Sequence, residues 1–420
     1  MLLTGMPIFA GLGLTSIGIM LITEGSISSV ADTVFAKLDN GILTAIPMFA
    51  FMAHVMIRSK VVDDLYDAAN ALVGHFKGGL GVATVLACTV FAAISGSSVA
   101  TALTIGSSAI PQMQRFGYRP SDTYGVIAAG GTLGILIPPS VTMIVYGIAT
   151  ETSIGRLFLA GVIPGLLLVG LFMAWSLYST WKSGNTDLLS ARSYTWKERF
   201  EVLPRVLPFL AIILGVLYAM YGGIATPSET AAVGALLCLI IAIVIYKLWH
   251  PRDLWVVLRD STKESVMILF IIAAAGVFSY MLSSLYITQS IAEWIGTLDV
   301  NRWVLMGAVN LFLLIAGFFL PPVAVILMAA PILLPIIITA GFDPIWFAVI
   351  LTINMEIGLI SPPVGLNLYV ISGIAPDISL KTILTGSLPF VACMVLAIVL
   401  LCLFPGLATW LPDAVMGARL

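Results

Sequence analysis

The chain has 420 residues, of which 60% are hydrophobic and 10% are charged, and its formal net charge is −2. A soluble protein of ordinary composition carries about 25% charged residues, so most of this surface must face lipid or other apolar helices. The composition excludes an ordinary soluble enzyme, and the small net charge argues neither for nor against nucleic-acid binding. We therefore predict an all-α polytopic membrane protein that forms a single unit over residues 1–420.

Apolar segments of spanning length follow one another along the chain. They cover residues 2–22, 41–57, 121–149, 154–181, 205–221, 226–248, 263–284, 343–374 and 379–404. The first is long enough to span, so we interpret it as a membrane helix rather than a cleaved signal. Polar stretches at 61–74 and 252–260 are typical of amphipathic helices at the membrane interface. The longest polar loop covers residues 182–204.

Two apolar regions, 78–113 and 301–338, differ from the others because each is about twice the length of one helix and is interrupted near its middle. The interruptions are "SGSS" at 95–98 and "FLPP" at 319–322. This pattern predicts two re-entrant helical hairpins whose tips lie inside the membrane. The alternative is a pair of full crossings joined by a very tight loop.

The basic residues predict which loops are cytoplasmic, because Lys and Arg are concentrated on that side. Basic clusters lie between Lys182 and Arg205 and between Lys247 and Lys263. If both are cytoplasmic, the N-terminus is cytoplasmic and the C-terminus periplasmic. The first hairpin then opens to the cytoplasm and the second to the periplasm.

An internal repeat connects the two regions that contain these hairpins. The sequence "GILIPPS" at 134–140 returns as "GLISPPV" at 358–364, a shift of 362 − 138 = 224 residues. The same shift places Pro111 on Pro335, Gly117 on Gly341 and Pro120 on Pro344. The predicted orientations are opposite, and an inverted repeat is typical of secondary transporters. We assign residues 78–164 to repeat 1 and residues 301–389 to repeat 2, each with a hairpin and a broken helix.

The paired prolines explain why these helices should be broken. Proline lacks a backbone donor and disrupts the preceding turn, which leaves carbonyl groups without helical partners. Such groups are costly in hydrocarbon unless they are buried or line a cavity. Two broken helices and two hairpin tips would therefore bring free carbonyls and half-helix ends together near the midplane, where they suit ions and substrate.

Two polar features lie within these apolar regions. Residues 95–98 place three serines and a glycine at the first predicted tip, and neutral oxygen ligands suit a weakly held Na⁺. Glu356 is the acidic residue most clearly inside a span, which makes it a functional candidate. It could tune an ion site, accept a proton or cap a broken backbone, and the sequence favours none of these.

Four stretches resemble the large membrane subunit of tripartite ATP-independent periplasmic (TRAP) transporters. They are "SGSSVATALTIGSSAIPQM", "GGTLGILIPPS", "GRLFLAGVIPGLLL" and "EIGLISPPVGLNLYV", and the resemblance runs from about residue 5 to 405. It implies an elevator-type fold like that of the wider ion-transporter group, in a bacterial inner membrane. It also implies Na⁺-driven uptake of an organic acid, such as sialic acid or a C4-dicarboxylate, with two or more Na⁺ ions per cycle.

The resemblance also implies partners. These are a small four-helix membrane subunit, expected as a separate chain because this one begins at the large subunit's first span, and a soluble periplasmic binding protein. Lipid surrounds the assembly, and no nucleic acid is implied.

The resemblance assigns site residues by motif. The ion-binding residues would be Ser95, Gly96, Ser97, Ser98, Gly134, Ile137 and Pro138 in the first site, and Leu320, Pro321, Gly358, Ser361 and Pro362 in its mirror. The substrate-binding residues would be Thr101, Pro139, Ser140, Val323, Glu356, Pro363 and Asn367. The second tip departs from the pattern because it reads "LPPVAV" instead of a serine cluster, so backbone carbonyls must serve there.

The sequence leaves one alternative function open and argues against another. A stand-alone Na⁺- or H⁺-coupled carboxylate symporter without a binding protein would have similar hairpins. An intramembrane hydrolase would need a Ser–His pair or paired aspartates within spans, which the sequence lacks. We therefore expect no enzymatic activity, no catalytic residue and no organic cofactor.

Overall fold

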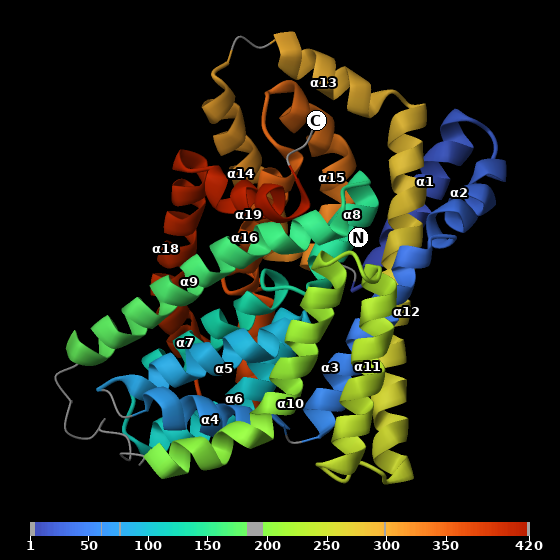
Figure 1. The fold of residues 1–420 in the computed structure, drawn as a ribbon. Coiled ribbons are helices and arrows are strands. Elements are labelled where there is room, and N and C mark those ends of the chain that lie inside the picture. The colour runs from blue at the N-terminus through green and yellow to red at the C-terminus, as the bar shows by residue number, and fades with distance from the viewer. Residues whose placement is uncertain (1–4, 60, 75–76, 183–195, 298–299, 418–420) are drawn as a thin grey trace.

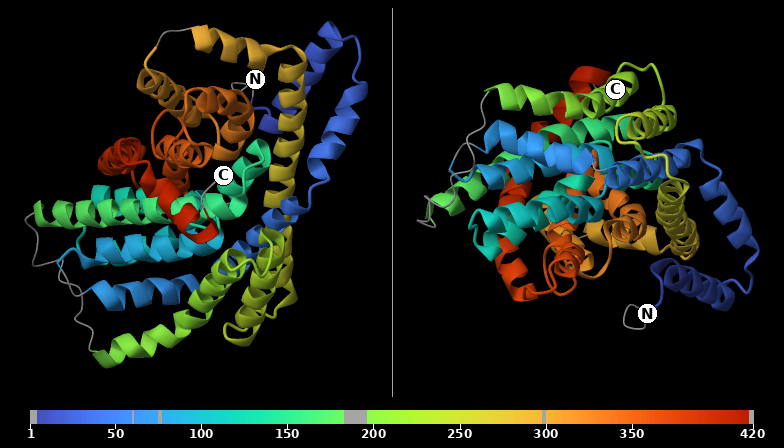
Figure 2. Two further views of the ribbon diagram at one scale, coloured as in Figure 1. Left: turned by 45° about the horizontal axis from the view of Figure 1, so that its top comes forward. Right: turned by 90° about the horizontal axis from the view of Figure 1, so that it is seen from below.

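A computed structural model describes residues 5–59, 61–74, 77–182, 196–297 and 300–417, and all the regular elements in these ranges are helical (Figure 1). The helices fall into a lateral group and two groups that correspond to the repeats. The lateral group consists of α1 (Ile8–Thr23), α2 (Ser28–Leu38), α3 (Ala45–Arg58), α11 (Pro227–Val244) and α12 (Pro251–Ser284). Helix α12 packs against α1, α2 and α3, and α3 packs against α11. In Figure 2 the N-terminal helices α1 and α2 lie at the edge of the molecule beside α12.

Helix α12 corrects one prediction. Its 34 residues run without interruption, so the segment 252–260 is the first part of a long helix and not a separate interfacial one. At 1.5 Å per residue the helix is about 50 Å long, well beyond a hydrocarbon core of about 30 Å. The polar segment at its start is therefore the part that extends past the hydrocarbon.

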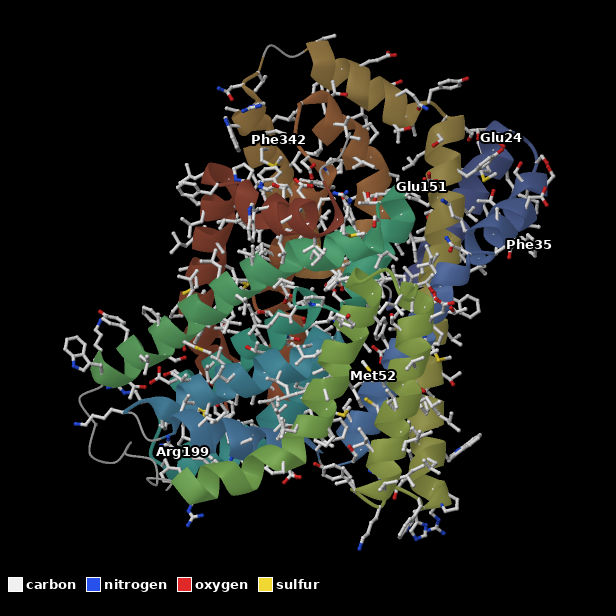
Figure 3. The ribbon with its side chains drawn as sticks, in the orientation of Figure 1. Glu24, Phe35, Met52, Glu151, Arg199 and Phe342 are labelled. Carbon is white, nitrogen blue, oxygen red and sulfur yellow. The ribbon has the colours of Figure 1, made fainter. Side chains whose placement is uncertain are left out.

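Polar contacts fix both ends of the lateral group. At one end the Arg58 Nη2 atom lies 2.6 Å from Asp253 Oδ1, which joins the end of α3 to the start of α12. At the other end Ser228 Oγ donates to the carbonyl of Gly41 over 3.0 Å. The end of α3 and the start of α12 therefore lie on the same side of the molecule. Figure 3 places Arg199 at the lower end of the molecule and Glu24 and Glu151 at the upper end.

Repeat 1 contains the first hairpin and the first broken helix. The hairpin consists of α5 (Gly79–Ser95) and α6 (Ser98–Arg115). The broken helix consists of α7 (Pro120–Thr132), a 3-10 turn at Leu133–Ile135 and α8 (Val141–Thr150), and α9 (Ile154–Lys182) follows it. Helix α4 (Val61–Val73) packs against α5 and α10 (Trp196–Tyr221), so the predicted interfacial helix buries its apolar face against protein.

Repeat 2 has the same order of elements. Its hairpin consists of α14 (Arg302–Phe319) and α15 (Pro322–Thr339). Its broken helix consists of α16 (Pro344–Leu359) and α17 (Leu366–Ile374), followed by α18 (Leu380–Leu403). The peptide bonds Pro138–Pro139 and Pro362–Pro363 are both cis. In Figure 1 the first hairpin lies in the lower half of the molecule and the second in the upper half.

Other elements differ from the expected boundaries. Helix α10 begins at Trp196, inside the segment 182–204 that was expected to be a loop, and residues 183–195 lie outside the described ranges. Helices α2, α13 (Ile287–Thr297) and α19 (Gly406–Met416) were not expected. They connect or flank the apolar segments, and α19 packs against α9 through a contact of Arg156 Nη1 with Asp413 Oδ1 at 3.1 Å.

The two repeats interlock through direct contacts between helices. Helix α7 packs against α18, α6 against α17, and α8 against α15. At the first of these contacts Gly125 faces Gly386, and a Cβ added to Gly125 would lie 2.2 Å from the carbonyl oxygen of Gly386. Small residues allow such close approach between membrane helices. Elements of repeat 1 are thus packed directly on elements of repeat 2.

The Gly125–Gly386 contact gives a first testable prediction. Gly125→Ala should lower the thermal stability of the purified protein, because the added methyl group cannot be accommodated unless α7 and α18 separate. Overpacking of this kind costs about 1–3 kcal/mol. Gly170→Ala on α9, where an added Cβ meets nothing within 4 Å, is the matched control. Equal melting temperatures for the two variants would contradict the contact.

Candidate functional site

The first hairpin tip lies directly on the first helix break. Gly96 at the tip has a φ of +58°, and a Cβ there would lie 2.7 Å from the carbonyl oxygen of Pro139. From the other side, a Cβ on Gly134 would lie 2.5 Å from the carbonyl oxygen of Ser97. Backbone therefore touches backbone at both points, and glycine is the residue that permits it. Because a break between two half-helices lies within the membrane, the hairpin that ends on it is re-entrant.

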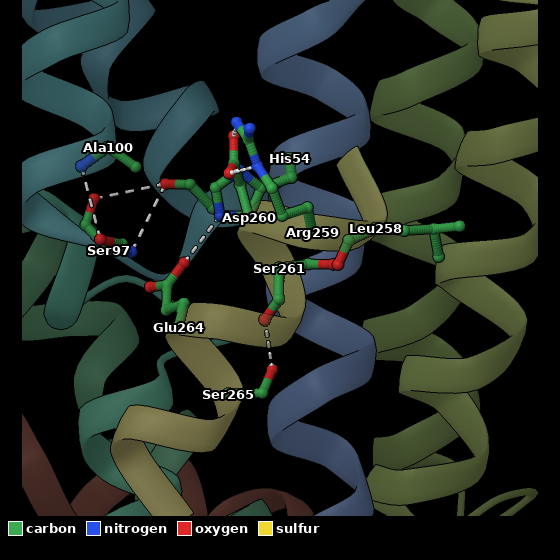
Figure 4. A network of polar contacts seen from close by, with 10 residues as sticks. His54, Ser97, Ala100, Leu258, Arg259, Asp260, Ser261, Glu264 and Ser265 are labelled. Carbon is green, nitrogen blue, oxygen red and sulfur yellow. Dashed lines mark hydrogen bonds and ion pairs between the residues drawn. The ribbon is translucent and has the colours of Figure 1, made fainter. Parts of the chain in front are cut away.

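Hydroxyl groups at this tip form a small buried network. Ser95 Oγ lies 3.0 Å from Thr101 Oγ1, and the Thr101 hydroxyl donates to the Ser97 carbonyl over 2.8 Å. The Ser97 hydroxyl accepts from the Ala100 amide over 3.4 Å and so caps the start of α6, as Figure 4 shows. Each hydroxyl oxygen has two lone pairs, so those that donate to a neighbour still have acceptor capacity. The tip can therefore supply neutral oxygen ligands.

A contact between the repeats reaches the same tip. The Ser98 hydroxyl donates to Glu356 Oε2 over 3.3 Å, and both residues are buried. Glu356 lies near the end of α16, in repeat 2, whereas Ser98 begins α6 in repeat 1. The carboxyl group thus lies with the first-tip residues, which the sequence alone did not indicate.

The second tip and break are arranged differently. A Cβ on Gly358 would lie 2.4 Å from the carbonyl oxygen of Gly317, so this break packs against the last turns of α14. Ser361 is buried, but Pro362 and Pro363 are exposed, whereas the first break is buried almost throughout. The two halves of the predicted site are therefore not equivalent.

Comparison with known proteins identifies the family. Residues 1–407 match the family described as "Tripartite ATP-independent periplasmic transporter, DctM component". The chain belongs to this family.

Two curated relatives match over nearly their whole length. The chain is 40% identical over 403 residues to the C4-dicarboxylate TRAP transporter large permease protein DctM of Pseudomonas aeruginosa, covering 96% of this chain and 93% of that one. It is 31% identical over 418 residues to the sialic acid TRAP transporter large permease protein SiaM of Vibrio cholerae, covering 99% and 97%. These relatives are transport proteins, so the chain is a large permease subunit of a TRAP transporter in a membrane.

A solved structure supports the fold. The YdaH transporter of Alcanivorax borkumensis superposes with a TM-score of 0.65 at 14% identity, covering 97% of this chain and 98% of that one. At this level of identity the likeness concerns the fold alone. It agrees with the polytopic all-α architecture of this large permease subunit.

The residues predicted to bind substrate lie in three kinds of surroundings. The hydroxyl groups of Thr101 and Ser140 are buried and engaged, since Ser140 Oγ donates to the Ile135 carbonyl and accepts from the Met143 amide. Val323 is half-buried. Asn367 is buried at the start of α17, and its amide nitrogen and oxygen have no hydrogen-bond partner among the described residues. Asn367 therefore has free hydrogen-bonding groups for a ligand.

Two supporting residues of the permease were not expected from the sequence. Ser387 on α18 donates to the Ile360 carbonyl over 3.2 Å and so satisfies a backbone group at the second break. Gly317 provides the backbone surface on which Gly358 packs. Ser387 lies in "TGSLP", which aligns with "LAGVIP" of the first repeat, and a serine inside an apolar span was the available signal. No pattern in the sequence marked Gly317.

The contact between tip and break gives a second prediction. Gly96→Ala should lower both thermal stability and transport, because alanine at this φ is strained by about 1–2 kcal/mol and its methyl group would clash with Pro139. Gly373→Ala on α17 is the control, since an added Cβ there meets nothing within 4 Å. The measurement is a melting curve of the purified subunit alongside uptake in proteoliposomes. A Gly96→Ala protein with wild-type stability would show that the tip is free to move away from the break.

Proposed function

We propose that this subunit imports an organic acid by Na⁺ symport, with an elevator-type movement and delivery by a periplasmic binding protein. The observation that carries the proposal is the buried contact of the Ser95–Ser98 tip with the break at Gly134–Pro138. Hydroxyl and carbonyl oxygens meet there within a membrane protein, and such surroundings suit Na⁺. Ca²⁺ and Mg²⁺ usually recruit more carboxylates.

We propose that the Na⁺ gradient supplies the energy for uptake. The sequence contains no Gly-x-x-x-x-Gly-Lys-Ser/Thr motif, which gives no basis for ATP hydrolysis. Two sites are proposed, one at the first tip and break and one among Leu320, Pro321, Gly358, Ser361 and Pro362. The second site depends on backbone carbonyls and the Ser361 side chain.

The substrate is proposed to be a C4-dicarboxylate. The relative at 40% identity is named for that substrate class, and the one at 31% is named for sialic acid. Asn367, with its buried and unpartnered amide, is the group we place against the substrate.

An elevator movement is supported by the way the helices pack. The repeat elements interlock through the pairs α7–α18, α6–α17 and α8–α15, while α1, α2, α3, α11 and α12 pack mainly on one another. We propose that the first set moves as one body against the second. The small membrane subunit, as a separate chain, would then brace the second set, with the N-terminus cytoplasmic and the C-terminus periplasmic in the inner membrane.

The third prediction tests the coupling and the partners together. The subunit is reconstituted into liposomes with its small subunit, and the binding protein is supplied outside with labelled dicarboxylate. Uptake should require an inward Na⁺ gradient and stop when choline replaces Na⁺. Omitting the binding protein, or the small subunit, is the control and should abolish uptake.

Two results would contradict the proposal. Robust concentrative uptake by this chain alone would favour a stand-alone symporter. Full uptake driven by an H⁺ gradient in Na⁺-free buffer would reject Na⁺ as the coupling ion.

The fourth prediction tests the serine tip. Ser97→Ala removes one hydroxyl and should raise the Na⁺ concentration needed for half-maximal uptake. The loss of one neutral polar contact costs about 1–2 kcal/mol, which corresponds to roughly five- to thirtyfold in apparent affinity. Expression should stay near normal, because the substitution keeps the tip small.

The control for Ser97→Ala must also remove a helix cap. Ser379→Ala meets this need, because Ser379 Oγ accepts from the Thr382 amide over 3.3 Å at the start of α18, away from the tip. Ser108 is unsuitable as a control, since its hydroxyl donates to Asp63 over 2.6 Å. If both variants keep the wild-type Na⁺ requirement, the serine cluster is packing, and the ligands must be sought among the carbonyls of Gly134–Pro138.

A further inference from the structure

We propose that the Glu356 carboxylate is a ligand and the countercharge of the cation held at the first hairpin tip. The second repeat thus supplies an acidic ligand to a site whose other candidate ligands come from the first. This inference rests on the Na⁺ coupling proposed above. It assigns Glu356 to the ion site, whereas the family resemblance placed it among the substrate residues.

The position of the carboxyl group carries the argument. Its Oε2 atom accepts from the Ser98 hydroxyl at 3.3 Å, and the backbone of Ile135 in the first break lies close to the same carboxyl group. Gly134, the residue before Ile135, packs directly on the Ser97 carbonyl. The carboxyl group therefore lies where the tip and the break meet.

The carboxyl group is incompletely satisfied. Glu356 is fully buried, with 0% of its surface exposed, and its Oε1 atom has no hydrogen-bond partner among the described residues. Within the same described ranges, none of the ion pairs involves Glu356. An isolated buried carboxylate is very costly, and such groups are found paired or bound to metal ions. Because Oε1 and Oε2 share one carbon, the free oxygen lies beside the Ser98 contact.

The charge balance indicates a monovalent cation. The other candidate ligands at the first tip are neutral hydroxyl and carbonyl oxygens, so one carboxylate and one Na⁺ give a site without net charge. A divalent ion would leave one positive charge uncompensated in a region from which water is largely excluded. The site therefore suits Na⁺ better than Ca²⁺ or Mg²⁺.

The residue of repeat 1 that is equivalent to Glu356 carries no charge. The 224-residue shift places Glu356 on Thr132, a buried residue whose hydroxyl donates to the Ala129 carbonyl of its own helix over 2.6 Å. Thr132 therefore offers no charge to the second tip. We infer that the first site binds Na⁺ more tightly than the second, and that its ion joins the two repeats.

The experiment measures Na⁺ binding apart from transport. The purified complex of large and small subunits is titrated with NaCl at constant ionic strength in choline chloride, and thermal stabilisation gives the Na⁺ midpoint. Glu356→Gln keeps the size of the side chain and a hydrogen-bond acceptor for Ser98 but removes the charge. Its Na⁺ midpoint should rise at least tenfold. Thr352→Val on the same helix, whose hydroxyl bonds only within α16 to the Ala348 carbonyl, is the control and should keep the wild-type midpoint.

A second variant provides the test if Glu356→Gln does not fold. Ser98→Ala removes the hydroxyl that faces Glu356 and should raise the Na⁺ midpoint several-fold. A wild-type Na⁺ midpoint in Glu356→Gln overturns the assignment of Glu356. If Glu356→Gln does not fold, a wild-type midpoint in Ser98→Ala overturns it instead. Either result leaves the Na⁺ coupling intact. No stabilisation of the wild-type complex by Na⁺ overturns the coupling and this assignment together.

Discussion

This structure depends on one constraint: inside the membrane, every backbone N–H and C=O group needs a hydrogen-bond partner. Water cannot satisfy an interrupted helix in hydrocarbon, so each break must be surrounded by protein. The first break meets this requirement by burial against a hairpin that enters the membrane to reach it. The Ser140 hydroxyl binds the Ile135 carbonyl, and glycines at 96 and 134 let the two backbones touch. The same shortage of partners that makes a break costly leaves oxygen atoms available to an ion.

The two repeats meet this constraint in different ways. The first break is buried apart from the half-buried Ile137, while the prolines of the second are exposed and its Ile360 carbonyl is satisfied from α18 by Ser387. Repetition of sequence therefore does not impose repetition of surroundings. The contacts described at the second break, from Gly317 and Ser387, come from its own repeat. The first tip instead contacts a residue of the other repeat, since the Ser98 hydroxyl donates to Glu356.

Much of this architecture could be predicted from local patterns. The broken helices and both hairpins follow from paired prolines and interrupted apolar runs, and the repeat follows from proline spacing. The continuity of α12 could not be predicted, because a polar first third looks like a separate interfacial helix when its packing is unknown. The contact of the Ser108 hydroxyl with Asp63 on α4 also has no signal in the sequence. The contact of Glu356 with Ser98 joins residues 258 positions apart, and one sequence gives no information about such pairs.

The length of α12 has a mechanical meaning. The apolar part of α12 is about as long as the hydrocarbon core is thick. The polar part before it therefore lies in the aqueous layer and continues the same rigid helix. The end of α3 is fastened to that extension by Arg58 and Asp253. The height of this junction above the lipid therefore depends on the fixed length of the helix and on the thickness of the surrounding bilayer. In a thicker bilayer the same helix would extend less far into the aqueous layer unless its tilt changed.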